Sequence, residues 1–209
     1  MTATGRPRGF DREEALNAAM LVFWRKGFAA SSLPDLFGAM GIKSPSLYAA
    51  FGSKEALYLE AIGHYVKTVG PTIWGHLNDS PTAREGIERL LLAAADNLPG
   101  CGTTPAGCMV TLAGIGEEAT EAIQQAARKI RQHCLDMIRT RIADGVVDRE
   151  LPPSTDLDAL SRFFLGAYQG IAIQARDGAA AVELKGIALV ATAAWPVSGQ
   201  FSRQVDRES

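Results

Sequence analysis

A short run of hydroxyl-bearing and small side chains, "SPSLYAAF", occupies residues 44–51. If this run forms a helix in the major groove of DNA, the small side chains of Ser44, Ser46 and Ala49 let the helix come close to the base edges. The Ser46 hydroxyl can then hydrogen-bond to more than one base, whereas Pro45 can make only apolar contact, for example with a thymine methyl group. The chemistry available to this run is therefore recognition, by hydrogen bonding and close fit.

Catalytic and metal-binding patterns are not found in the sequence. The three histidines, His64, His76 and His133, have no metal-ligand spacing, and the chain contains neither a Gly-x-Ser-x-Gly motif nor a phosphate-binding loop. The three cysteines are an odd number without Cys-x-x-Cys spacing, which disfavours structural disulfides and a zinc site. We therefore expect no metal and no cofactor, and the sequence disfavours the rival interpretation as a helical hydrolase or lyase.

The composition is that of a globular protein without a membrane segment. The chain has 209 residues, of which 47% are hydrophobic, and no apolar run reaches the roughly 18 residues that cross a bilayer. The N-terminus lacks the apolar stretch of a signal peptide, so a cytoplasmic protein is expected. A formal net charge of −2 does not decide for or against a DNA partner, because basic residues can be concentrated locally, as Arg6 and Arg8 are in the N-terminal arm.

Helix signals dominate the sequence and strand patterns are nearly absent, which predicts an all-α fold. Helices are expected to begin at the caps Asp11, Ser32, Ser44 and Ser53 and to stop at Gly27, Gly41 and Gly52. Pro45 falls at the first position of its helix, where its fixed φ favours helix formation. A tight turn around Gly41 joins the second and third helices, which is the layout of a helix-turn-helix whose last helix lies in the major groove.

The run from Phe10 to Ala61 closely resembles the DNA-binding domain of TetR-type repressors. The matching features are Gly27-Phe28, Ser31-Ser32, Gly41-Ile42, Leu47-Tyr48, Phe51 and the run "SKEAL" at residues 53–57. Two local differences are Leu36-Phe37, where the family usually has Ile-Ala, and Pro45 in the recognition helix. These differences concern the pose of that helix and the bases that it reads, and they leave the expected fold unchanged.

The resemblance implies that Tyr48 donates its hydroxyl to a phosphate and that Lys54 contacts a phosphate through its charge. Ser32 can add a phosphate contact where the dipole of the second helix favours an anion, and the arm can enter an adjacent minor groove. The full predicted DNA-binding set is Arg6, Arg8, Ser32, Lys43, Ser44, Pro45, Ser46, Tyr48 and Lys54. The alternatives are that Tyr48 packs with Phe51 in a small core, that Lys43 and Lys54 are ordinary solvated lysines, and that the arm has no role.

The remaining sequence predicts further helices, for a total of about nine. They are expected at residues 83–98, 108–115, 117–143, 156–176 and 180–195, with a turn-rich connector over 144–156. Residues 157–195 and the run "GCMVTLAG" at 107–114 resemble an AcrR-like branch of the TetR family. We expect an arm and helix-turn-helix domain over 1–53, a ligand-binding and dimerisation domain over 54–197, and a flexible tail over 198–209.

The resemblance also assigns the middle of the chain to a small-molecule cavity. Its candidate lining residues are Ile62, Tyr65, Val66, Trp74, Leu91, Met109, Leu112, Met137, Phe163, Phe164 and Tyr168, with His133 and Gln169 as polar anchors. The alternative is that these residues are ordinary core. A ligand regulates only if it binds the DNA-competent and incompetent arrangements with different affinity. We expect the fourth helix, which runs from Lys54 to the cavity, to transmit ligand binding to the DNA-binding domain.

The last two predicted helices, 156–176 and 180–195, are expected to form a homodimer. A dimer doubles the base contacts of a small DNA-binding domain by binding a palindrome. Small residues on one of the two helices and apolar residues on the other suit a four-helix interface. The alternative is that these apolar stripes are internal core.

The combined prediction is a ligand-responsive homodimeric transcriptional regulator, a repressor that binds a palindromic operator and is released by a small-molecule effector. A second hypothesis is redox or electrophile sensing, because Cys108 begins a short helix that favours a reactive thiolate and Cys101 lies on a nearby loop that can resolve an oxidised sulfur. A buried, inert Cys108 is the alternative. An interaction module without DNA binding is the other rival.

Overall fold

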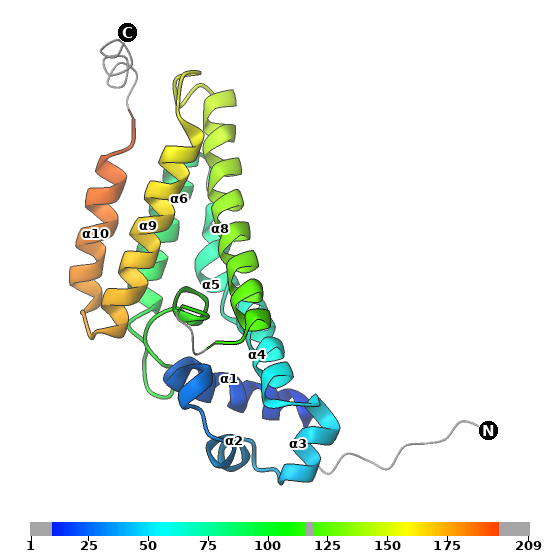
Figure 1. The fold of residues 1–209 in the computed structure, drawn as a ribbon. Coiled ribbons are helices and arrows are strands. Elements are labelled where there is room, and N and C mark those ends of the chain that lie inside the picture. Colours follow the sequence, from blue (N-terminus) through cyan, green and yellow to red (C-terminus); the bar gives the residue numbers. More distant parts are fainter. Residues whose placement is uncertain (1–9, 116–118, 197–209) are drawn as a thin grey trace.

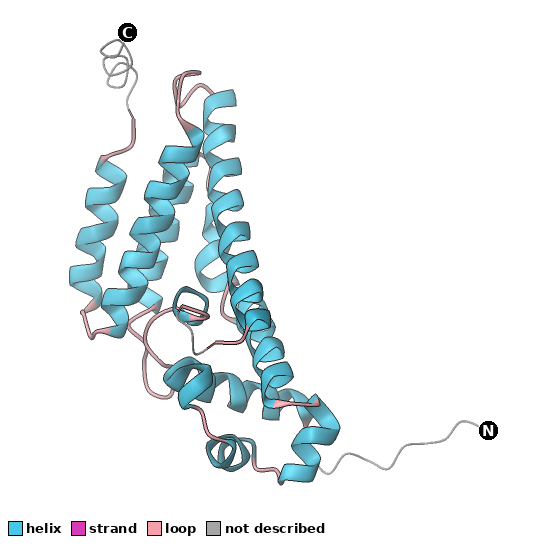
Figure 2. Cartoon of the chain, viewed as in Figure 1, coloured by secondary structure: helices cyan, strands magenta, loops and turns pink. Residues whose placement is uncertain are grey.

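The computed structural model describes residues 10–115 and 119–196, which form ten α-helices and one short 3-10 helix without a strand. Figure 2 shows this helical content along the chain, which confirms the all-α prediction. The first half contains α1 (Arg12–Ala30), α2 (Leu33–Met40), α3 (Ser44–Phe51), α4 (Lys54–Thr68), α5 (Pro71–Trp74) and the 3-10 helix η1 (Gly75–Leu77). The second half contains α6 (Ala83–Asn97), α7 (Met109–Leu112), α8 (Glu121–Val147), α9 (Leu157–Arg176) and α10 (Ala181–Ala193).

The helices are arranged as a small N-terminal unit below a taller bundle. In Figure 1, α1, α2 and α3 form the unit at the lower end, and α4 leads from it into the bundle of α6, α8, α9 and α10. A hydrophobic core continues from the unit into the bundle and includes Phe23, Leu47 and Phe51 of the unit. None of the described helices is long and apolar enough to cross a membrane.

The predicted helix starts at Ser32 and Ser53 are confirmed by their hydrogen bonds. The Ser32 hydroxyl accepts from the backbone N–H of Asp35 at 3.2 Å, and the Asp35 carboxylate accepts from the backbone N–H of Ser32 at 3.0 Å, which completes a capping box. The Ser53 hydroxyl accepts from the backbone N–H of Ala56 at 3.0 Å. Between these caps, Gly41 ends α2 in the left-handed conformation, with φ of 63°.

The predicted cap of the third helix is wrong by one residue. The backbone carbonyl of Lys43 accepts from the N–H groups of Ser46 and Leu47, at 2.9 and 3.2 Å, so Lys43 occupies the N-cap position. Ser44 and Pro45 are then the first two helical residues, and no side chain among the described residues caps this helix. Proline is still tolerated there, because N–H groups in the first turn have no intrahelical partner.

One further prediction fails for a tertiary reason. α8 continues through the predicted turn at Asp144-Gly145 and ends at Val147. Gly145 packs so closely against Ala83 that an added Cβ would lie 2.8 Å from the Ala83 Cβ, and this contact favours glycine inside the helix. Helix α5 and η1 were not predicted, since each is only one turn long.

Candidate DNA-binding surface and effector cavity

Helix α3 presents an exposed outer face of mostly small side chains and a buried apolar inner face. Leu47 and Phe51 are buried, Pro45 and Ala49 are exposed, and Tyr48 is 45% exposed. The alternative in which Tyr48 packs in a small core with Phe51 therefore does not hold. Most side chains on the exposed face are small, as is required of a helix that approaches base edges closely.

Arg12 fixes α3 against its neighbours, a role that no sequence pattern indicated. Its guanidinium donates to the backbone carbonyl of Ala50 at 3.2 Å and pairs with the Glu60 carboxylate on α4 at 2.7 Å. The same guanidinium lies over the Phe51 ring, 4.4 Å from the ring centroid. One side chain at the start of α1 thus joins the end of α3 to the middle of α4.

Lys54, the first residue of α4, rests on an aromatic ring. Its Nζ lies 4.5 Å from the centroid of the Phe28 ring, which belongs to the last turn of α1, just after the break at Gly27. Partial burial lowers the pKa of the Lys54 ammonium, because desolvation disfavours the charged form. Lys54 is therefore held in one place by α1, whereas Lys43 at the N-cap of α3 is exposed.

Ser32, predicted to contact a phosphate, already serves the capping box of α2. Its hydroxyl donates to the Asp35 carboxylate at 2.8 Å, and Lys26 pairs with the same carboxylate at 2.8 Å. The hydrogen bonds from Lys26 and then from Ser32 hold the pKa of Asp35 at about 2. A phosphate at this helix end would meet an ionised carboxylate that Lys26 neutralises. The other two predicted contacts, Arg6 and Arg8, lie outside the described residues.

A cavity of about 340 Å³ lies between α4, α5, α7, α8 and α9. Seven predicted residues line it, namely Tyr65, Val66, Trp74, His133, Met137, Tyr168 and Gln169. The other six predicted residues, Ile62, Leu91, Met109, Leu112, Phe163 and Phe164, do not line it. Ile62, Leu91, Met109 and Phe164 are buried in core contacts, and Phe163 points outward with 46% of its surface exposed. Helical spacing identifies an inward face but cannot separate solid core from cavity wall.

Cysteine and tyrosine side chains meet in the wall of the cavity. Tyr65, Cys108, Cys134 and Tyr168 all line it. Burial raises the pKa of both tyrosines well above its usual range, and the neighbouring Cys108 adds to this effect. Burial also raises the pKa of Cys134 to about 12, which keeps that thiol protonated at neutral pH. Cys134 was not predicted here, whereas Cys101, the predicted resolving residue, is exposed on the loop.

The cavity wall is mostly apolar and contains no aspartate or glutamate among the described residues that form it. Its cationic member is Arg131, which donates to the backbone carbonyls of Val110 and Ala113 at 3.0 and 2.8 Å. Burial lowers the pKa of this guanidinium below its usual value. Edge-to-face ring pairs frame the cavity, Trp74 with Tyr168 at 4.9 Å and Trp24 with Tyr65 at 4.8 Å between centroids. No group of three or more His, Cys, Asp or Glu side chains in the described chain is placed to hold a metal ion.

The predicted dimer helices divide into an internal and an external face. Ala172, Ala175, Ala191 and Trp195 are buried within the chain, so these positions are core, as the alternative interpretation held. The outward face instead carries Phe163, Val182, Leu189 and Val190, of which Val182 and Val190 are 76% and 74% exposed. A shallow groove on this face runs over Phe163, Gly166, Ile187 and Val190.

The arrangement is that of a helix-turn-helix DNA-binding regulator with an all-helical second domain. Residues 15–61 match the model of the family described as "Bacterial regulatory proteins, tetR family". The HTH-type transcriptional repressor ComR of Escherichia coli (strain K12) is 32% identical over 92% of each chain, and BdcR of the same organism is 33% identical over 83% of each. This chain therefore belongs to the TetR family of transcriptional regulators, and it is not an enzyme.

Solved structures agree with this assignment over nearly the whole chain. A cysteine mutant of the TetR family transcriptional regulator CifR, complexed with 26-bp double-strand operator DNA, superposes with a TM-score of 0.86 at 38% identity. The alignment covers 91% of this chain and 100% of that one. A second CifR cysteine mutant with the same length of operator DNA gives a TM-score of 0.87, also at 38% identity.

Proposed function

We propose that this chain is a homodimeric repressor that binds a palindromic operator and is released from it when a small molecule occupies the cavity. Residues 1–53 act as the DNA-binding domain, and residues 54–197 act as the effector-binding and dimerisation domain. The observation that carries the proposal is the position of α4, which has Lys54 at one end and the cavity-lining Tyr65 and Val66 at the other. A shift of α4 in response to an effector would move the recognition helix.

The DNA contacts divide by chemistry. Ser46, Pro45 and Ala49 on the outer face of α3 read base edges, because they are small and accessible. Tyr48 and Lys54 bind phosphates and therefore set register and contribute little to sequence selection. Lys43 adds a phosphate contact from its exposed N-cap position. Action on chromosomal DNA implies a cytoplasmic protein.

Dimerisation through α9 and α10 supplies the second recognition helix. Exposed valine, leucine and phenylalanine side chains on one face of both helices leave an apolar area that a monomer would present to water. Two-fold pairing of this face covers it and creates an isologous four-helix interface. Each of the two recognition helices then binds one half-site of a palindrome.

The cavity wall indicates an effector that is aromatic or otherwise apolar and either neutral or anionic. The volume of the cavity, about 340 Å³, is at the lower end of the range for ligand pockets, so the effector is small. A cation would be desolvated there without a carboxylate among the described lining residues and with Arg131 nearby, which costs free energy. His133 and Gln169 offer hydrogen bonds to a polar end.

A thiol-reactive effector is the second candidate, and the position of Cys108 in the cavity wall favours it. A small electrophile that enters the cavity would meet this sulfur directly. Cys101 is exposed on the loop, and no step through it is needed. Operator binding that survives electrophile treatment equally in the wild type and in Cys108→Ser would remove this candidate.

The proposal is tested by titrating the full chain against DNA from upstream of its own coding sequence, with fluorescence anisotropy at several salt concentrations. Affinity should fall steeply with salt. Tyr48→Phe should weaken binding to all sequences by a similar factor, while Ser46→Ala should change the preference among bases at one position of each half-site. Absence of salt-sensitive, sequence-selective binding to this DNA and to operators selected from random sequence would refute the proposal.

The effector class is tested with three probes of one shape, 2-naphthol, 2-naphthoate and 2-naphthylmethylammonium. The neutral and anionic probes should raise the melting temperature and weaken operator binding. Met137→Trp, which reduces the cavity, should diminish both effects. Stabilisation by the cationic probe alone would show that the electrostatic argument about the cavity is wrong.

A further inference from the structure

The loop between α6 and α7 contacts both halves of the molecule. It is tightly folded, because the backbone N–H of Thr104 donates to the carbonyl of Cys101 at 3.0 Å and that of Gly107 donates to the carbonyl of Leu98 at 2.7 Å. Gly107 adopts φ of 81°, and an added Cβ would lie 3.1 Å from the Ala172 carbonyl oxygen on α9. The loop therefore packs directly on α9.

Helix α1 of the DNA-binding domain holds this loop through two side chains. The indole Nε1 of Trp24 donates to the carbonyl of Gly107 at 2.9 Å in a buried position. The guanidinium of Arg25 donates to the carbonyl of Thr103 at 3.0 Å. A buried hydrogen bond of this kind is costly to lose, since the unpaired carbonyl would remain without water.

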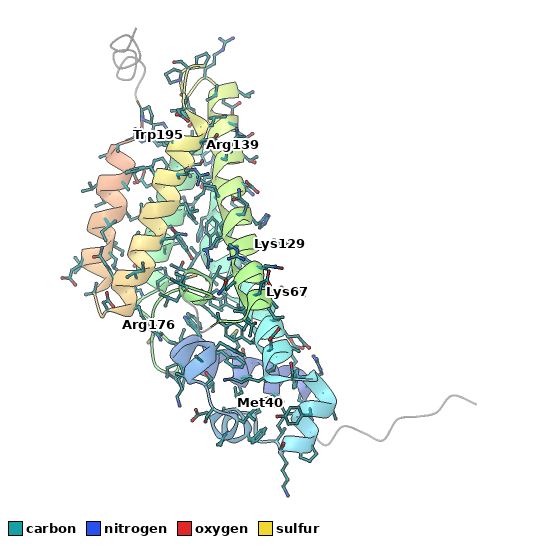
Figure 3. The ribbon with its side chains drawn as sticks, viewed as in Figure 1. Met40, Lys67, Lys129, Arg139, Arg176 and Trp195 are labelled. Atoms are coloured by element: carbon teal, nitrogen blue, oxygen red, sulfur yellow. The ribbon has the colours of Figure 1, made fainter. Side chains whose placement is uncertain are left out.

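Arg176, the last residue of α9, joins the same two elements from the other side. Its Nη1 donates to the carbonyl of Trp24 at 3.2 Å and to that of Ala106 at 3.1 Å, and its Nη2 donates to the carbonyl of Arg25. Figure 3 shows Arg176 at the end of α9 that faces α1. Trp24 and Arg25 lie three and two residues before the break in α1 at Gly27, where φ is 77°, so their carbonyls belong to an interrupted helical turn. A guanidinium suits this place, because helix C-termini carry unpaired carbonyls and partial negative charge.

We infer that Trp24 and Arg176, through the loop over residues 101–107, fix the angle of the DNA-binding domain on α9 and so set the half-site spacing that the dimer accepts. This inference rests on the proposed function, in which α9 is a dimer helix. It adds a second connection between the domains beside α4. Trp24 and Arg176 are positioning residues, since they contact backbone carbonyls and lie away from the exposed face of α3.

The same connection reaches the cavity wall. Gly107 is followed by Cys108, which lines the cavity, and the Trp24 ring packs edge to face on Tyr65, another lining residue. A molecule that displaces Cys108 therefore disturbs the hydrogen bond from Trp24 to the adjacent carbonyl of Gly107. A molecule that displaces Tyr65 disturbs the ring contact between Tyr65 and Trp24. Occupancy of the cavity is expected to change the accepted spacing through this loop.

The test measures affinity for operators whose half-sites are separated by the selected spacing and by one or two base pairs more or fewer. Arg176→Gln should reduce the preference for the selected spacing by about fivefold or more, which is the lower end of coupling between distant sites. Trp24→Phe, which keeps an aromatic ring and removes the N–H donor, should act in the same direction. Arg84→Gln is the matched control, because it removes an exposed positive charge at the start of α6.

An unchanged spacing preference in Arg176→Gln and in Trp24→Phe would overturn the inference, as would a uniform loss at every spacing equal to that of Arg84→Gln. Failure of the wild type to bind any operator would instead refute the proposed function. Circular dichroism melting identifies a variant that does not fold. If either Arg176→Gln or Trp24→Phe does not fold, the spacing preference of the other variant decides the outcome.

The connection to the cavity is tested with a cavity-filling substitution. Val110→Phe adds an aromatic ring to the wall two residues after Cys108 and should shift the preferred spacing in the wild type but not in Arg176→Gln. An equal shift in both backgrounds, or no shift in either, would show that the loop does not carry the effect. Met137→Phe fills the cavity from α8 and replaces Val110→Phe if that variant does not fold.

Discussion

Lys54→Gln is the substitution that tests the phosphate contact at the start of α4. The side chain is held over the Phe28 ring at 4.5 Å, so its charge is presented at a fixed position relative to α1 and α3. If each Lys54 neutralises one phosphate, its loss lowers the salt dependence of binding by about 0.9 in the logarithmic slope. A dimer loses two such contacts, or about 1.8.

This change in slope corresponds to a large difference over an ordinary salt range. Between roughly 50 and 200 mM salt, the affinity of the wild type should fall about 12-fold more than that of Lys54→Gln. The pKa of Lys54 is lowered by burial, so its contribution should disappear at lower pH than that of an ordinary lysine, as the ammonium deprotonates. Phe28→Leu keeps the charge of Lys54 and removes the ring beneath it. This variant should bind DNA more weakly while keeping most of the salt dependence of binding.

The assay is an anisotropy titration at five or more salt concentrations at neutral pH. Lys129→Gln is the control, because Lys129 is exposed on α8 away from α3, as Figure 3 shows, and its removal should not change the slope. A slope for Lys54→Gln equal to that of the wild type would refute the assignment of Lys54 as a phosphate contact and would leave it a solvated lysine.

The remaining predictions concern assembly and stability. Val190→Glu, on the exposed face of α10, should convert the dimer into a monomer in analytical ultracentrifugation and reduce operator affinity, whereas Val147→Glu, equally exposed at the end of α8, should do neither; a dimeric Val190→Glu protein would place the interface elsewhere. Burial raises the pKa of Tyr58 to about 12 from an ordinary 10.0, so unfolding, which frees the hydroxyl to ionise, becomes more favourable as pH rises from 10 to 12. Tyr58 should account for about 2 kcal/mol of the stability that the wild type loses over that window in denaturant titrations. Tyr58→Phe should lose less, and equal alkaline losses in the two proteins would contradict the burial argument.

The features that the sequence predicted well depend on local chemistry. Ser32 and Ser53 are caps because a hydroxyl can satisfy backbone N–H groups three residues ahead, and Gly41 ends α2 because glycine adopts positive φ without strain. The exposed face of α3 follows from the same signals, since the boundaries of the helix define which of its residues are exposed. Lys43 in place of Ser44 as the cap is a shift of one residue within that pattern.

The features that the sequence did not predict depend on contacts between distant segments. Gly145 remains helical because it packs against Ala83, which overrides its turn preference. Arg176 donates to carbonyls about 150 residues earlier in the chain, and no periodicity indicates such a partner. The cavity was predicted by resemblance, but its wall required the structure, because buried Phe164 and cavity-lining Tyr168 lie on the same face of α9 at helical spacing.

The most direct measurement of the central claim compares a palindromic operator with the same DNA in which one half-site is scrambled. Two protomers should bind the palindrome in a salt-sensitive manner, and scrambling one half-site should weaken binding at least about a hundredfold, because several base pairs are mismatched at once. Equal affinity for the intact and scrambled DNA would contradict the account of α3 as the recognition helix of a dimeric repressor.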